Sequence, residues 1–178
     1  MNKHLLVGAA LVAVLWIPAS AQSLPSPKTS VSEGEQSAIS FFVEDSVGDV
    51  QLGRLGLQKA TDPSARALAQ AMVRDHTRTA LAGMDVARQI GDEQAQLKPG
   101  DDNQIELSHL ARYSGAKFDR EYVSALVDAH KSDIQTAHDA LEFATTPAVR
   151  AYLRTTVTVD TRHLRMAEAA QARVGSGD

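Results

Sequence analysis

The chain has 178 residues, a net charge of −4, only 4% aromatic residues and no cysteine. This length allows one domain with a real hydrophobic core but not two large domains. The acidic balance and the scarcity of aromatic rings argue against a nucleic-acid partner. The lack of cysteine excludes disulfides, thiolate clusters and cysteine nucleophiles.

The first 21 residues have the pattern of a removable export signal. Lys3 and His4 form a short basic start, residues 5–17 are almost wholly apolar, and Pro18-Ala-Ser-Ala21 ends in the small-x-small pattern of a cleavage site. The apolar stretch is short for a bilayer span, and polar sequence follows it. We therefore expect cleavage after Ala21, no integral membrane segment in the mature protein, and a periplasmic or secreted location.

Residues 22–35 are polar and rich in proline and serine, which predicts a flexible arm ahead of a folded domain at residues 36–174. From about residue 36 to residue 60, apolar side chains recur at helical spacing, interrupted by Gly48, Gly53 and Gly56. Glycine weakens a helix, so these residues predict the close approach of a neighbouring helix, with a break near Gly48 as the alternative.

The remaining helices are marked by their start and stop residues. Asp62-Pro63 begins a second helix, because aspartate caps free amides and proline is preset for the first helical position. We expect this helix to extend to about Gln89, ahead of a stop at Gly91. A shorter helix is expected from about Asp102 to Tyr113, closed by Gly115.

Phe118-Asp119 is expected to open a fourth helix that extends to about Ala144, and Thr146-Pro147 repeats the cap-plus-proline signal for a fifth. No stretch alternates apolar and polar residues as a strand does. The sequence therefore predicts an all-α domain, a bundle of four long helices with one additional short helix.

Three of the long helices carry a histidine on their apolar face. His76 lies within Met72-Val-Arg-Asp-His-Thr77, and His130 and His163 take comparable positions in the fourth and fifth helices. In His130-Lys-Ser-Asp133 and Asp160-Thr-Arg-His163, a spacing of three residues places an aspartate on the same helix face as the histidine. Each aspartate either shares a metal with its histidine or orients it.

These positions predict a single divalent metal, zinc or iron by ligand type, held by His76, His130 and His163 and completed by Asp49 or Asp160. Neutral imidazole also suits copper and nickel, so ligand chemistry alone does not select the ion. The alternative interpretation is three interior histidines bonded to carboxylates and hydroxyls, as most buried histidines are.

Asp75 points about 100° away from His76 around the helix. We interpret it as the partner of an arginine or of another helix rather than as a ligand; the candidate arginines are Arg74, Arg78 and Arg120.

The remaining tyrosines, histidines and carboxylates are not expected to form a functional site. Tyr122 and Tyr152 are expected to pack in the core with bonded hydroxyls. His109 and His138 are expected at the surface. Carboxylates are plentiful, but no pattern in the sequence positions two of them across a cleft.

Several stretches together resemble a bacterial exported family called domain of unknown function 4142. They are Asp49-Val-Gln-Leu-Gly53 with Lys59-Ala60, Met72-Val-Arg-Asp-His-Thr77, Ser114-Gly-Ala-Lys-Phe-Asp119 with Tyr122, and His130 with His163-Leu164. The resemblance covers roughly residues 37–172 and implies a ferritin-like four-helix bundle of unsettled activity.

Two features depart from what the resemblance implies. Family members commonly carry glutamate near Asp49, and often a second near Gln51. The Glu-x-x-His motif that di-iron sites of ferritin-like bundles normally use is also absent from the long helices. The shorter aspartate and the neutral glutamine weaken the case for a strong metal ligand on the first helix, and the missing bridging glutamates weaken the case for a redox enzyme.

The sequence therefore predicts an exported ferritin-like helical protein that binds a divalent metal through inward histidines, with envelope stress as a candidate role. The alternative is a metal-free periplasmic helical module that binds an envelope partner or a small ligand. A dimer is compatible with either.

Overall fold

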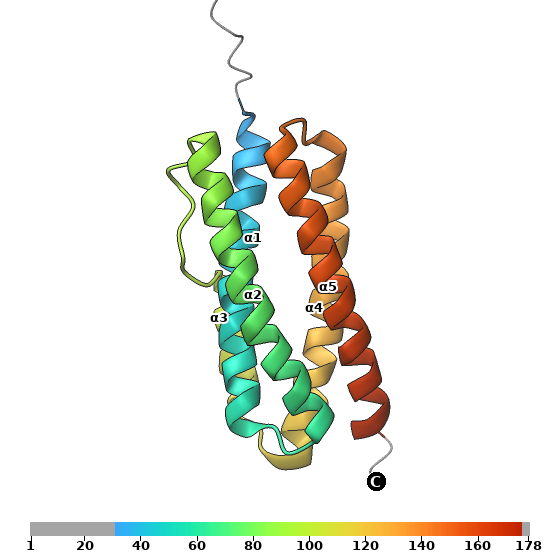
Figure 1. The fold of residues 1–178 in the computed structure, drawn as a ribbon. Coiled ribbons are helices and arrows are strands. Elements are labelled where there is room, and N and C mark those ends of the chain that lie inside the picture. Colours follow the sequence, from blue (N-terminus) through green and yellow to red (C-terminus); the bar gives the residue numbers. More distant parts are fainter. Residues whose placement is uncertain (1–30, 176–178) are drawn as a thin grey trace, which may run out of the picture.

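The computed structural model describes residues 31–175, which form five α-helices and no strand (Figure 1). The helices are α1 (Glu33–Lys59), α2 (Pro63–Ile90), α3 (Asp101–Leu110), α4 (Gly115–Phe143) and α5 (Pro147–Val174). This confirms the expected all-α bundle of four long helices and one short one. The expected export signal lies outside the described residues.

The long helices pack as two pairs. α1 packs mainly against α2, and α4 packs mainly against α5, while α2–α5 and α1–α4 contacts join the pairs into a bundle (Figure 1). The short α3 lies against α1 and α4. Among residues 31–175, no helix has the length and apolar character needed to cross a membrane.

The ends of α2 follow the expected signals. The Asp62 side chain accepts hydrogen bonds from the amides of Ser64 and Ala65, and Gly91 takes the left-handed conformation with φ 72°. Two other expected boundaries were wrong. α1 begins at Glu33, inside the range expected to be a flexible arm, and α4 begins at Gly115, the residue expected to close α3.

Glu35 explains the early start of α1. Ser32 and Glu35 form a capping box, in which each side chain bonds the backbone of the other residue. Glu35 also accepts hydrogen bonds from the amides of Thr145 and Thr146, at 2.8 and 2.6 Å. The Thr146 side chain makes no capping bond, contrary to expectation. Glu35 thus ties the start of α1 to the α4–α5 connection.

Asp119 does the same at the opposite end of the bundle. Its carboxylate, on α4, accepts hydrogen bonds from the amides of Thr61 and Asp62, both at 2.9 Å. The α1–α2 connection is therefore tied to the first turns of α4. The two carboxylates hold the register between the helix pairs.

The glycines of α1 mark close helix contacts, as expected, and α1 continues unbroken through Gly48. A Cβ atom on Gly53 would lie 2.9 Å from the carbonyl oxygen of Ala69, and one on Gly56 would lie 2.6 Å from the Tyr122 ring. Gly48 faces the Asn103 side chain on α3 in the same way. Larger residues at these positions would push α2, α3 or α4 outward.

The core consists of two apolar clusters at different heights of the bundle. One cluster uses the second half of α1, the first halves of α2 and α4 and the end of α5. The other uses the opposite halves of the same helices. Between them every long helix passes through a layer of buried polar side chains: Asp49 from α1, Asp75 and His76 from α2, His130 and Asp133 from α4, and Asp160 and His163 from α5.

Replacing Glu35 with glutamine should destabilise the fold in a pH-dependent way. Burial raises the pKa of Glu35, but hydrogen bonds from Thr146, Ser32 and Thr145 outweigh it and lower the pKa to about 2. The ionised form therefore stabilises the fold above about pH 4.5, and that stabilisation is lost as the pH falls toward about 2. Glu35→Gln should cost about 1–3 kcal/mol at pH 7.

Urea denaturation of both proteins at several pH values checks this prediction. The difference in unfolding free energy should shrink between pH 4.5 and 2, because only the wild type loses a charge at this position. A difference that stays constant over this range would contradict the assignment.

Candidate metal centre

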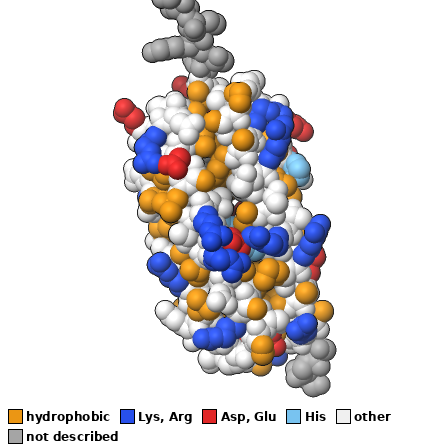
Figure 2. All heavy atoms as spheres, in the orientation of Figure 1, with side chains coloured by type: hydrophobic (Ala, Val, Ile, Leu, Met, Phe, Trp, Pro, Cys, Tyr) orange, Lys and Arg blue, Asp and Glu red, His pale blue; other side chains and the backbone are white. Residues whose placement is uncertain are grey.

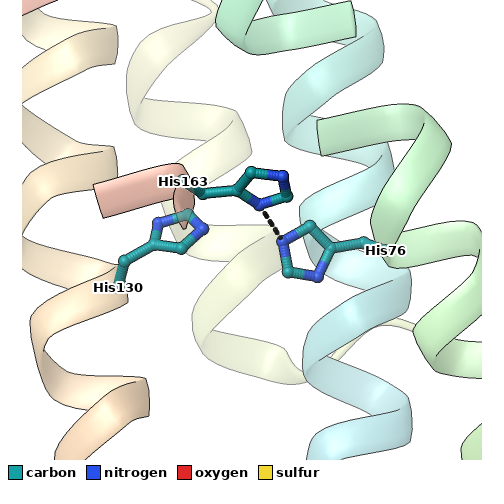
Figure 3. A group of neighbouring side chains, drawn as sticks. All are labelled: His76, His130 and His163. Carbon is teal, nitrogen blue, oxygen red and sulfur yellow. Dashed lines mark hydrogen bonds between the residues drawn. The ribbon is translucent and has the colours of Figure 1, made fainter. Parts of the chain in front are cut away.

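Three histidine rings, from α2, α4 and α5, face one another inside the polar layer (Figure 3). Their ring centroids lie 4.8 Å apart for His76 and His163, 5.5 Å for His130 and His163, and 5.7 Å for His76 and His130. None of the three side chains is more than 1% exposed. We call them the histidine cluster. The inward placement expected from helical periodicity is confirmed for all three.

The hydrogen bonds of His130 identify its tautomer. Its Nδ1 lies 2.8 Å from the carbonyl oxygen of Leu126, one turn earlier on α4. A carbonyl oxygen only accepts, so Nδ1 carries the hydrogen and Nε2 of the neutral ring holds a bare lone pair. This Nε2 is buried and has no hydrogen-bond partner.

His163 is held in the opposite tautomer by Asp75. Its Nε2 lies 3.1 Å from Oδ2 of Asp75, so Nε2 carries the hydrogen. Its Nδ1 therefore holds the bare lone pair, 3.0 Å from Nε2 of His76 (Figure 3).

Asp75 also pairs with basic side chains, as expected. Its carboxylate accepts hydrogen bonds from Arg74 on α2 and from Arg162 on α5, and Arg78 lies further away at 3.9 Å. Burial raises the pKa of Asp75, but Arg74, His163 and Arg162 outweigh burial and lower it. Figure 2 shows basic side chains gathered around an acidic one on the face formed by α2 and α5. The sequence did not predict that Asp75 would orient His163.

His76 connects the histidines to Asp49. Its Nε2 lies 3.0 Å from Nδ1 of His163 and 3.2 Å from Oδ2 of Asp49. Because Nδ1 of His163 is an acceptor, Nε2 of His76 donates to it when no metal is bound. Oδ2 of Asp49 accepts no hydrogen bond despite this short distance, and Nδ1 of His76 has no partner.

All three rings are neutral near pH 7. Burial lowers the pKa of His76 well below its usual value, and the two neighbouring histidines lower it further. Burial also lowers the pKa of His130, to about 4. The pKa of His163 is lowered by burial, although Asp75 opposes this shift. Neutral imidazoles bind metal without first releasing a proton to solution.

The donor atoms fit a single ion. The ligand nitrogens of the histidine cluster all lie within 4.8 Å of one another. Two nitrogens bound to one tetrahedral zinc ion at about 2.1 Å are about 3.4 Å apart, so small movements of the rings suffice. Hydrogen bonding to carboxylates explains the orientation of His163, but it leaves Nε2 of His130 without a partner.

A group of aspartates adjoins the histidine cluster. The carboxylates of Asp45, Asp49 and Asp133 also lie within 4.8 Å of one another, and we call them the aspartate cluster. Asp160 was the alternative metal ligand in the sequence analysis. Its charge contributes to the raised pKa of Asp49 and of Asp133, and the histidine cluster does not include it.

Burial is the main cause of raised pKa values among these acids. It raises the pKa of Asp49 well above its usual value, that of Asp133 to about 9, that of Asp160 to about 8 and that of Asp45 to about 6. Neighbouring aspartates raise the first three further, and a hydrogen bond from Asn103 opposes the shift of Asp45.

The aspartates lie at a cavity of about 740 Å³ bordered by α1, α3 and α4, which we call the acidic cleft. Asp45 on α1 and Asp133 on α4 both line it. The interpretation that no carboxylates meet across a cleft was therefore wrong. Sequence reasoning also missed Asp45, although its spacing of four residues from Asp49 places both on one helix face.

The tyrosines of the core differ from expectation in one respect. Tyr122 and Tyr152 are buried, as expected, but neither hydroxyl has a hydrogen-bond partner in the structure. Burial, assisted by the charge of Asp49, raises the pKa of Tyr122, so its hydroxyl keeps its proton. His109 is half-buried and His138 is exposed, which confirms their peripheral positions.

The tautomers are directly testable by nuclear magnetic resonance. In metal-free protein at pH 7, a long-range ¹H–¹⁵N spectrum should show His130 as the neutral Nδ1–H form and His163 as the neutral Nε2–H form. An Nε2–H or doubly protonated His130 would contradict the geometry, because its Nδ1 faces a carbonyl oxygen.

Two solved structures have a similar fold. A DUF305 fragment from Deinococcus radiodurans matches with a TM-score of 0.70 and 13% identity, over 80% of this chain and 98% of that chain. CopM in the Cu(II)-bound form matches with a TM-score of 0.66 and 17% identity, over 78% of this chain and 96% of that chain. These identities show a shared helical-bundle fold and nothing more.

A search of the curated proteins finds no match to this chain. The sequence match to a family is more informative. The family described as Domain of unknown function (DUF4142) matches residues 20–170, nearly the whole of the chain after the expected export signal. The chain belongs to this family.

Proposed function

We propose that this protein binds one divalent transition-metal ion through Nε2 of His76, Nε2 of His130 and Nδ1 of His163. The observation that carries the proposal is the bare, buried Nε2 of His130, which has no hydrogen-bond partner. Its own Nδ1 is committed to a carbonyl oxygen, so the ring offers Nε2 only as an acceptor. A metal ion among the three nitrogens satisfies it.

Asp49 supplies the fourth ligand in this proposal. Its Oδ2 lies 3.2 Å from the coordinating nitrogen of His76, yet makes no hydrogen bond. Asp160, the alternative, is not part of the group that the three histidines form. Asp75 orients His163 through the ring nitrogen that faces away from the metal, as carboxylates behind metal-bound histidines commonly do.

The ligand set suits zinc, iron or copper. Imidazole nitrogen binds all three, and one carboxylate does not change this. Similarity to CopM, which was solved in a Cu(II)-bound form, supports adding copper to the zinc and iron favoured by sequence. For nitrogen and oxygen ligands, divalent affinity rises from iron to copper and falls again at zinc. Copper should therefore displace zinc and ferrous ion from this site.

The cellular role in this proposal is metal binding in the envelope after removal of an export signal. Burial of the ligands and the absence of a Glu-x-x-His motif from the four long helices favour holding an ion over oxygen chemistry. Binding to the folded state alone also stabilises the fold. Sequestration during envelope stress, with or without a protein partner, is consistent with such a site.

Elemental analysis of the mature protein, purified without a histidine tag, tests the proposal. Zinc- or copper-loaded protein should contain one ion per chain, and loading should raise the melting temperature. His130→Ala should abolish binding, whereas His138→Ala, on the exposed side of the same helix, should leave it unchanged. Asp75→Asn should weaken binding about 10- to 100-fold, because it removes the support of His163.

Two results would refute the metal assignment. One is wild-type protein that holds no stoichiometric ion and melts at the same temperature with zinc, copper or ferrous ion. The other is His130→Ala protein that binds as wild type does. Either result would favour the alternative of a metal-free helical module that binds a partner or small ligand.

A further inference from the structure

The acidic cleft concentrates negative charge on one side of the bundle. Its lining residues include seven acids and neither lysine nor arginine; the acids are Glu44, Asp45, Asp101, Asp102, Glu106, Asp128 and Asp133. The α2–α5 face differs, because basic side chains gather there (Figure 2). A cation is therefore attracted to the α1–α3–α4 side of the molecule.

The aspartate cluster lies where this cleft meets the interior. Asp45 is half-buried and Asp133 is 8% exposed, and both line the cleft. Asp49 lies deeper, with 2% of its surface exposed. Carboxylate oxygens from all three lie within 4.8 Å of one another, a separation that one ion can bridge.

These acids lack a positive partner. Between residues 31 and 175, no lysine or arginine forms an ion pair with Asp45, Asp49, Asp133 or Asp160. Buried carboxylates are normally paired with a cation or bound to a metal.

A second observation is independent of the three clustered carboxylates. Oδ2 of Asp160 is buried without a hydrogen-bond partner, and the hydroxyl of Tyr152 is in the same condition. The charge of Asp45 contributes to the raised pKa of both residues. The polar layer thus holds buried oxygen atoms without a hydrogen-bond partner in addition to the three clustered carboxylates.

We propose that Asp45, Asp49 and Asp133 form a second cation site, specific for a hard divalent ion of the Mn²⁺ or Mg²⁺ class. An all-oxygen ligand set suits such ions and discriminates against those that prefer nitrogen or sulfur. Small hard cations also keep several water molecules, which the cleft has room to hold. Asp160 and Tyr152 would bond those waters or the ligands.

Asp49 connects this site to the histidine cluster. One of its oxygens faces Nε2 of His76, while its carboxylate also belongs to the aspartate cluster. The two sites share Asp49 but differ in their other ligands, which are three histidine nitrogens in one site and the carboxylates of Asp45 and Asp133 in the other. The aspartate site therefore does not require an ion among the histidines, and the two are tested separately.

Titration of metal-free mature protein with Mn²⁺, followed by electron paramagnetic resonance, tests this site. Bound Mn²⁺ does not contribute to the signal of the free ion. The signal should therefore stay below that expected from the Mn²⁺ added, by an amount that reaches one equivalent per chain. Asp133→Asn and Asp45→Asn should each weaken binding at least about tenfold, the effect of removing even an outer support of a metal site. Asp139→Asn, an exposed aspartate on α4, is the matched control and should bind as wild type.

Two further measurements distinguish Mn²⁺ binding at the aspartate cluster from metal binding at the histidine cluster and from loss of the fold. His130→Ala should lose zinc and copper but retain Mn²⁺, so failure of the histidine site leaves this result intact. Without metal, Asp133→Asn should melt at a higher temperature than wild type, because it removes a buried acid with no positive partner. Circular dichroism checks that each variant is folded. If Asp133→Asn does not fold, Mn²⁺ binding by Asp45→Asn, a change at a half-buried position, tests the site instead.

The proposal is overturned if wild-type protein leaves the free Mn²⁺ signal undiminished up to about 1 mM, the weak end for oxygen-ligand sites in proteins. It is also overturned if folded Asp133→Asn and Asp45→Asn bind Mn²⁺ as tightly as the Asp139→Asn control.

Discussion

The cost of burying ionisable side chains governs this structure. All four long helices place at least one such residue in a single layer between two apolar clusters. Burial of charge is unfavourable unless each group is paired, neutralised or bound to metal. The apolar clusters supply the opposing stability, and the carboxylates of Glu35 and Asp119 tie together the ends of the helix pairs. The bundle thus encloses several buried polar atoms that have no hydrogen-bond partner among its own side chains.

The polar layer has two chemically different sides. Toward α2 and α5, Asp75 is fully paired with arginines and holds His163 in one tautomer. Toward α1 and α4, the aspartates have no cationic partner among the described residues, and a cleft opens beside them. Asp49 lies between the two sides. Neutral nitrogen donors thus meet on one side of this residue and acidic oxygen donors on the other, which is the basis for assigning different ions to them.

Local signals in the sequence predicted much of this fold. α2 begins at Asp62-Pro63 and ends at Gly91, as expected. Helical periodicity correctly placed three histidines in the interior of the bundle: His76, His130 and His163. Long-range pairings were missed. Glu35 bonds amides 110 and 111 residues away, which no local pattern indicates, although the Ser32-x-x-Glu35 spacing is a local signal for the start of α1. Asp45 was missed because only the packing of α1 against α3 and α4 creates the cleft that makes it a candidate ligand. Such features depend on which helix faces meet.

The central claim is that the histidine cluster holds an ion, and anomalous diffraction tests it most directly. Crystals of the zinc- or copper-loaded protein, measured on both sides of the metal absorption edge, should show one strong anomalous peak inside the bundle. The peak should lie about 2.1 Å from Nε2 of His76, Nε2 of His130 and Nδ1 of His163. Loaded crystals with no peak inside the bundle, or with the ion only at surface histidines such as His138, would contradict the account.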